Sequence, residues 1–159
     1  MYNLMVTAAD NAWEERSYVW DKSRVFESPY TSEEIRIRLV GLAPAAIAEL
    51  CSFPTLFTYE HGTDGVSRFG KIKQIQQRGS EVRVVIELDE GIPPLPREAI
   101  MAHEWDLEIQ TYEFNRTHWA VKSANLDQII HHAEARFIFD SISNTLRFIK
   151  TIEGGNFGK

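Results

Sequence analysis

The residues best suited to chemistry or ligand binding gather in one short segment, Tyr112–Lys122. Its eleven residues hold three aromatic rings, an imidazole and two cationic side chains. An arginine over an aromatic ring makes a cation–π contact, and aromatic and arginine side chains are enriched where proteins bind partners. The segment therefore predicts a ligand-binding surface with these anchors: Tyr112, Phe114, Arg116, His118 and Trp119. The alternative is a buried turn in which Trp119 fills the end of a barrel and Arg116 pairs with Glu113.

Carboxylates and imidazoles near this segment suggest a metal site. Asp106 and Glu108 would share one face of a strand, and with His118 they could hold a divalent cation that activates water. A metal-dependent hydrolase is therefore one alternative function. The chain lacks the HExxH, P-loop and GxSxG motifs, so the residues favour a solvated acidic strand face. They predict no metal site, no cofactor and no catalytic residue.

A run of basic residues further upstream supports a second alternative, a nucleic-acid-binding module. Five cations oppose the single acid Glu81 between residues 68 and 83, which gives a net charge of +4. A basic β-rich face of this kind contacts phosphates. The interface residues would be Arg68, Lys71, Lys73, Arg78 and Arg83. The competing interpretation is that exposed hairpin positions carry Lys and Arg because these residues keep sheet edges from aggregating.

The elements that position these residues follow from the spacing of apolar side chains. The strongest signal is a β-hairpin over Phe69–Leu88 that turns at Gln77–Ser80, and its second strand reads as a central one. The T-x-x-E capping box at Thr31 conflicts with the alternation that follows it, and we favour a strand there. The other expected strands are Ile35–Val40, Thr55–Tyr59, Trp105–Phe114 and Ala120–Lys122. Helices are expected at Ala8–Glu15, Pro44–Cys51 and Arg97–His103, and from Asn125 onward.

The last of these helices carries two apolar stripes that are offset from each other, with the change near Glu134–Arg136. The offset indicates a bend or a change of packing partner. The second stripe, from Phe137 to Ile149, is long for a helix at a chain end. Pairing two such helices across a two-fold axis would bury it, so the stripe predicts a possible homodimer.

Composition limits the class of protein. The 159 residues are 43% apolar and 25% charged, which suits one folded domain. The net charge of −6 argues against a protein that coats nucleic acid or an anionic membrane over its whole surface. One cysteine, no secretory signal at Met1 and no membrane-length apolar stretch together predict a cytoplasmic protein that does not enter membranes.

Three stretches carry a resemblance to a known kind of protein: Pro93–Pro96, Tyr112–Lys122 and Asn125–Leu126. The region from 35 to 130 resembles a module in uncharacterised bacterial proteins, where it sits beside TIR-like or other defence-associated effector domains. The resemblance implies a recognition or regulatory module in bacterial anti-phage defence. It assigns no catalytic residues.

These observations predict an α+β fold. We expect a single domain over 1–159 with a β-rich core at 31–123 and a C-terminal helical segment at 125–153. The core would be a small bent antiparallel sheet or an SH3-like barrel, with a groove near the proline loop and Arg116–Trp119. The predicted function is a non-enzymatic binding module that recognises a protein, a peptide or a small ligand.

Overall fold

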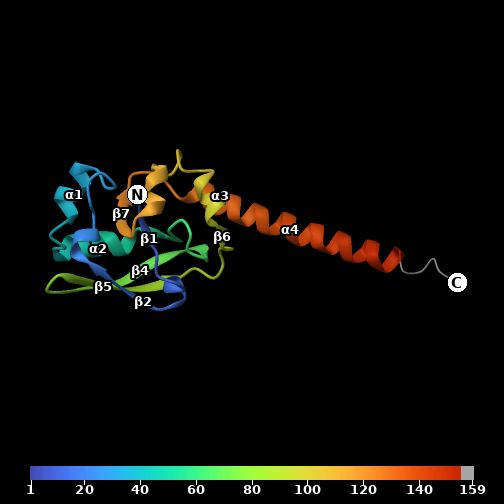
Figure 1. Ribbon diagram of the computed structural model, residues 1–159, viewed down its shortest axis with the longest axis horizontal. Coiled ribbons are helices and arrows are strands. Elements are labelled where there is room, and N and C mark those ends of the chain that lie inside the picture. Colours follow the sequence, from blue (N-terminus) through green and yellow to red (C-terminus); the bar gives the residue numbers. More distant parts are fainter. Residues whose placement is uncertain (155–159) are drawn as a thin grey trace.

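An open β-sheet with helices on both faces forms the body of the protein, and one long helix projects from it (Figure 1). The computed structural model describes residues 1–154. The strands are β1 (Tyr2–Thr7), β2 (Ser17–Asp21), β3 (Pro54–Tyr59), β4 (Val66–Arg78), β5 (Glu81–Leu88), β6 (Leu95–Pro96) and β7 (His118–Lys122). The α-helices are α1 (Glu33–Leu39), α2 (Pro44–Ser52), α3 (Arg97–Met101) and α4 (Asp127–Gly154). Short 3-10 turns are η1 (Ala12–Glu14), η2 (Lys22–Arg24) and η3 (Thr111–Asn115).

The predicted α+β class is confirmed, and the sheet is open rather than a closed barrel. Its order is β2-β5-β4-β3-β1-β7, with β6 paired to β4. All neighbours run antiparallel except β1 and β3, which are parallel. The sheet is therefore mixed. Two of its strands come from the first 21 residues, outside the predicted core at 31–123: β2 is one edge, and β1 lies next to β7 at the other edge.

Strands β1, β2 and β6 were not predicted from the sequence, and β1 was missed because both of its faces are buried. Leu4 and Val6 pack into the cluster under α3 and the start of α4, while Met5 packs into the opposite cluster under α1 and α2. A strand covered on both faces loses the alternation of apolar and polar residues that marks a half-exposed strand. The helix expected at Ala8–Glu15 is only the single turn η1.

The strand expected at Ile35–Val40 is wrong, since this segment is helix α1. Ile35 and Leu39 are buried, whereas Ile37 between them is 69% exposed. On a strand all three side chains would share one face, but on a helix only residues four apart do so. The capping box at Thr31 correctly indicated a helix, but it does not form: the N-cap is Ser32 without a side-chain hydrogen bond. Thr31 instead accepts a hydrogen bond from the amide of Val121, at 3.1 Å.

The strand expected at Trp105–Phe114 is also wrong, because the chain there forms turns and then η3. Glu108 has φ of 56°, a left-handed conformation that ends any strand. Leu107 and Ile109 point into the same apolar cluster from successive turns, which imitates strand alternation. The predicted helix Arg97–His103 is confirmed as the shorter α3, and the predicted helix Pro44–Cys51 as α2.

The predicted hairpin is confirmed as β4 and β5, and it requires a glycine at residue 70. A Cβ atom at Gly70 would overlap the carbonyl oxygen of Glu87 on β5. The three buried residues of β5, Val82, Val84 and Ile86, alternate with more exposed ones. Strand β5 pairs with β2 and β4 on its two edges, but only one of its faces is buried. The near-continuous run of Val and Ile had suggested that both faces are covered.

We expect Gly70→Ala to lower the free energy of unfolding by about 1–3 kcal/mol, the usual cost of forcing an extra carbon into a packed site. Gly41→Ala is the matched control, because nothing lies within 4 Å of a Cβ added there, and its effect should stay within about 0.5 kcal/mol. Urea denaturation of the two variants measures the difference. Equal effects would contradict the close approach of β4 to β5.

The C-terminal helix begins where it was predicted. The side chain of Asn125 accepts a hydrogen bond from the amide of Asp127, at 2.9 Å. Leu126, Ile129 and Ala133 pack onto the sheet, and beyond them α4 leaves the body of the protein (Figure 1). The offset between the two apolar stripes coincides with the point where α4 leaves the sheet. Of the helices within residues 1–154, none combines the length and apolar character that crossing a membrane requires.

Candidate functional site

Three of the five predicted anchors lie inside the protein. Phe114, His118 and Trp119 are each 0% exposed, whereas Tyr112 is 48% exposed. Strand β7 forms the edge of the sheet, but both its faces are covered, and Phe26 adds a backbone hydrogen bond to its outer side by donating to the carbonyl of Trp119 at 2.8 Å. The expectation that these three side chains face outward and anchor a partner is therefore wrong.

Trp119 is a core residue of the kind that the alternative interpretation described. Its ring packs edge-on against Phe26, with centroids 5.0 Å apart, and lies 6.4 Å from the ring of Trp20. Its indole Nε1 donates to Oδ1 of Asn3, at 3.1 Å. Trp119 thus joins β1, β2 and β7 in the cluster covered by α1 and α2.

Arg116 is partly exposed, but its guanidinium is already engaged. Nε and Nη2 donate to the two carboxylate oxygens of Glu27 at 2.9 and 2.5 Å. This bidentate hydrogen bonding lowers the pKa of Glu27 and raises that of Arg116. The predicted pairing with Glu113 is therefore wrong, and Arg116 instead holds the segment before α1 against the turn that precedes β7.

Glu113 has other partners and forms the centre of a buried ionic cluster. Its Oε1 accepts from Nζ of Lys122 at 2.7 Å and from the amide of Gln110 at 2.8 Å, and its Oε2 lies 3.1 Å from Nε2 of His118. Nδ1 of His118 lies 2.7 Å from the carbonyl oxygen of Arg116.

Burial and neighbouring charges shift the pKa values of this cluster in opposite directions. Burial raises the pKa of the Glu113 carboxyl, but the hydrogen bond from His118 and the charge of Lys122 outweigh it, so the net direction is down. Burial lowers the pKa of Lys122 despite the neighbouring carboxylate. Since the side chains of Glu113 and His118 are sealed from solvent, the cluster ties η3 to β7 and offers no access to a substrate.

The residues proposed for a metal site do not come together. Asp106 and Glu108 lie in turns rather than on a strand, and the carboxylate of Glu108 accepts from the amide of Ser123 at 3.1 Å. His118 is directed at Glu113. Within residues 1–154 no three metal-ligating side chains converge. The geometry assumed for the hydrolase alternative is therefore absent from the described part of the chain.

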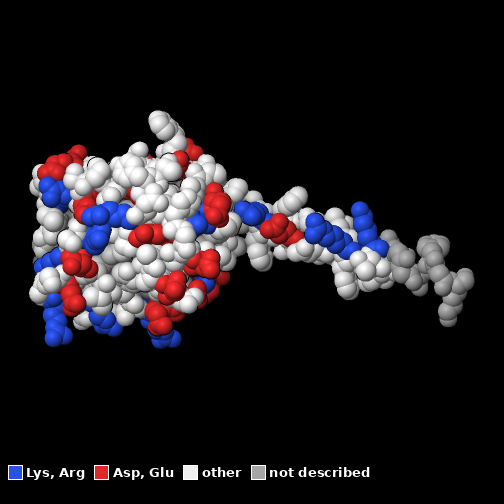
Figure 2. Space-filling view, in the orientation of Figure 1, with Lys and Arg blue, Asp and Glu red and all other residues white. Residues whose placement is uncertain are grey.

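The basic residues of the hairpin are interleaved with acids. Arg68 pairs with Glu14 and Glu90 at 3.3 and 3.0 Å. Lys71 and Lys73 share the carboxylate of Glu87 at 3.3 and 3.4 Å. Arg83 donates to the side chains of Gln76 and Ser17, and Arg78 lies opposite Glu81 in the strand register. The face drawn in Figure 2 likewise mixes both signs of charge. Nucleic-acid binding stays a prediction that this arrangement does not favour.

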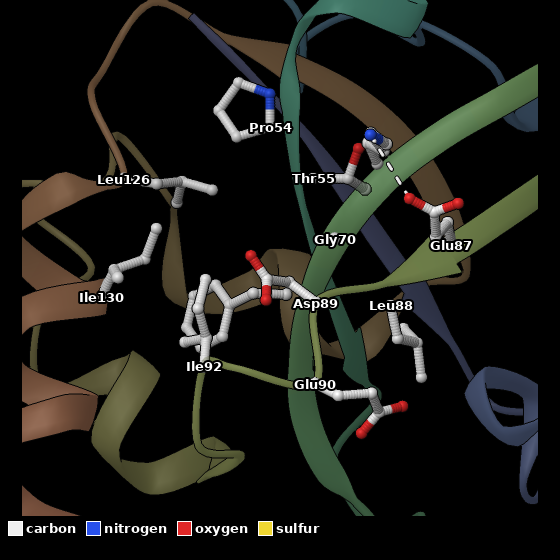
Figure 3. Close-up of a pocket in the computed structure, with 12 residues that line it drawn as sticks. Pro54, Thr55, Gly70, Glu87, Leu88, Asp89, Glu90, Ile92, Leu126 and Ile130 are labelled. Atoms are coloured by element: carbon white, nitrogen blue, oxygen red, sulfur yellow. Dashed lines mark ion pairs between the residues drawn. The ribbon is translucent and has the colours of Figure 1, made fainter.

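A groove does lie beside the proline loop, but its second wall is the start of α4 and not residues 116–119. Its volume is about 530 Å³. In Figure 3, Leu126 and Ile130 point into it from the helix side, and Asp89 faces them from the loop side. A second hollow of about 480 Å³ follows along α4, lined by Glu90, Gly91, Pro93, Pro94, Glu134, Phe137 and Ile138. The two hollows lead from the sheet onto the projecting part of the helix.

The projecting part of α4 has one strongly apolar side. Eight large apolar side chains on it are 44–69% exposed: Phe137, Ile138, Phe139, Ile142, Leu146, Phe148, Ile149 and Ile152. Ile138, Ile142, Ile149 and Ile152 form a central stripe, which we call the α4 stripe. Arg136, Asp140 and Arg147 lie on the opposite side. Figure 1 shows this part of the helix extending away from every other element.

Comparison with protein-family models, curated proteins and solved structures finds no significant match.

The sequence pointed to part of this surface. The stripe from Phe137 to Ile149 was identified from its spacing, but Ile152 and the hollow beside Pro93 and Pro94 were not. The signal for Ile152 was present, because it lies three residues after Ile149 and so continues the helical repeat. The hollow had no local signal, since it forms only when the proline loop meets α4.

Proposed function

We propose that this chain is a binding module for a protein partner, and that the apolar side of α4 is its binding surface. One observation carries the proposal: eight large apolar side chains stay exposed on a helix that leaves the domain. Soluble proteins rarely expose a contiguous apolar patch beyond a few hundred Å², and larger ones mark interaction sites. The exposure of these side chains supports a protein-binding role for α4 rather than for Tyr112–Trp119.

The domain does not need the α4 stripe for its own core. Two separate apolar clusters already cover the two faces of the sheet, and α4 contributes to them only up to Ala133. The side chains beyond that point make no contribution to either cluster. They are therefore available to a partner without any rearrangement of the sheet.

A protein is a better occupant of this surface than a lipid bilayer. Helices that lie on membranes carry Lys and Arg over their polar side. The exposed part of α4 mixes Arg136, Arg147 and Lys150 with Glu134 and Asp140. Three cations against two acids give these five residues a net charge of only +1, which suits a helix in contact with protein. The bacterial anti-phage setting that the resemblance implies stays a prediction.

Photo-crosslinking in cells tests the proposal. The full chain carries p-benzoylphenylalanine in place of Phe139 on the apolar side, or in place of Asp140 on the opposite side. We expect protein adducts, either with a different protein or with the chain itself, to form at residue 139 and to be several-fold weaker at residue 140. Equal yields at the two positions, or no adduct at residue 139, would overturn the proposal.

A further inference from the structure

We infer that the partner is a second copy of this chain, and that two α4 helices pair antiparallel along the α4 stripe. The inference rests on the proposed function and names its partner. Four features of α4 support it: the spacing of the stripe, the hollow at its end, the residues that flank it and the area that it exposes.

The spacing is that of a helix that pairs with another helix. Apolar or small residues recur at intervals of three and four, at Ala135, Ile138, Ile142, Thr145, Ile149 and Ile152. This is the alternating a and d pattern of a coiled coil, in which two helices share one seam. A helix that docks into a groove on an unrelated protein does not require such a regular repeat. The regular spacing therefore favours pairing with an identical helix.

The stripe fits itself when one helix is reversed. In an antiparallel pair, each a position of one helix faces a d position of the other. Ile149 then faces Ile138 of the second copy, Ile142 faces Thr145, and Ile152 faces Ala135. A two-fold axis through the middle of the seam makes both halves of the contact identical.

The hollow beside the proline loop favours this orientation. Pro93, Pro94, Phe137 and Ile138 line it together with Glu90, Gly91 and Glu134, so it lies at the end of the stripe nearest the domain. An antiparallel partner brings its Ile152 to the level of Ala135, beside the apolar part of this hollow. A parallel partner would instead leave both hollows open.

The apolar residues that flank the α4 stripe also favour the antiparallel orientation. Phe139 and Leu146 each lie next to a d position, at the e positions of the repeat. In an antiparallel pair these positions face each other, so Phe139 packs against Leu146 of the second copy. In a parallel pair Phe139 would face Glu134 instead, because e positions then face g positions. Only the antiparallel arrangement covers both apolar side chains with apolar ones.

The exposed area is sufficient for a stable dimer. Aromatic side chains present about 150–250 Å² each when accessible, so the exposed apolar area of the eight side chains is roughly 800 Å² per copy. A standard specific interface buries about 800 Å² per partner.

Sedimentation equilibrium of the purified full chain tests the pairing. At 1–100 µM we expect a mass near twice the chain mass of 18.3 kDa. Ile142→Glu should weaken association at least 100-fold, while Ser143→Glu, on the polar side of the same helix, should leave it unchanged. Both variants should leave the thermal unfolding temperature of the sheet domain unchanged, because neither position contacts the core. A wild-type monomer at 100 µM, or a trimer or tetramer, would overturn the inference.

Disulfide trapping tests the orientation. In a Cys51→Ala background, the variants Ile138→Cys and Ile149→Cys are oxidised separately and as a mixture. An antiparallel pair gives a crosslink mainly in the mixture, whereas a parallel pair gives one in each variant alone and would overturn the antiparallel assignment. If the purified chain is monomeric but residue 139 crosslinks to a different protein in cells, this inference fails and the proposed function stands. If neither occurs, both fail.

Discussion

Replacing Glu113 with glutamine is expected to lower the free energy of unfolding by about 3–5 kcal/mol, the usual cost of removing one partner from a buried ion pair. The carboxylate is fully buried and accepts hydrogen bonds from Nζ of Lys122 and the amide of Gln110. Without the carboxylate charge, the ammonium of Lys122 is left uncompensated in the interior. Urea denaturation at pH 7, followed by tryptophan fluorescence, measures the loss.

Glu87→Gln is the matched control for Glu113→Gln. Glu87 also pairs with two lysines, Lys71 and Lys73, but its side chain is half-exposed. Exposed ion pairs contribute at most about 1 kcal/mol, so this variant should change stability little. Adding Lys122→Met to Glu113→Gln should restore part of the loss, because it removes the unpaired charge. Similar effects of Glu113→Gln and Glu87→Gln would show that burial does not govern the strength of the cluster.

The same carboxylate gives stability a defined pH dependence. The pKa of Glu113 is lower in the folded protein than the ordinary value of a glutamate, so in acid the unfolded state binds more protons. The stabilisation is complete above the unfolded-state pKa, about 4.3, and is lost as pH falls through the folded-state pKa. The stability difference between wild type and Glu113→Gln should therefore shrink below about pH 4. A difference independent of pH down to the acid transition would contradict this assignment.

Elements stabilised by local signals could be predicted from the sequence. The hairpin of β4 and β5 follows from alternation around Gly79, and α2 follows from Pro44 at its first turn. The start of α4 follows from the cap at Asn125. In each case the deciding residues lie within a few positions of the element that they determine.

Elements decided by distant contacts could not be predicted. Strand β1 pairs in parallel with β3, which lies about fifty residues further along the chain, at Thr55 opposite Asn3. The burial of Trp119 depends on Phe26 and Trp20, from the opposite end of the chain. An aromatic residue near an arginine in the sequence occurs both in surface binding sites and in buried cores. Residue types alone therefore could not distinguish a ligand-binding surface from a buried turn at Tyr112–Lys122.

Trp119→Ala tests which of these two interpretations is right. We expect it to lower the free energy of unfolding by about 3–5 kcal/mol, as large-to-small changes of buried aromatic residues do. The change also removes the donor to the buried Oδ1 of Asn3, which adds to the cost. Trp105→Ala is the matched control, since Trp105 is 92% exposed and its loss should change stability by no more than about 0.5 kcal/mol.

The two proposed roles of Trp119 make opposite predictions for binding. If Trp119 is a core residue, any Trp119→Ala protein that remains folded at low temperature keeps its α4 surface, and crosslinking through residue 139 persists in the folded fraction. If Trp119 instead anchors a ligand, Trp119→Ala keeps its stability within about 0.5 kcal/mol and loses partner capture. The packing of Trp119 between Phe26 and Trp20 leads us to expect the first outcome, because that ring cannot reach a partner without opening the sheet.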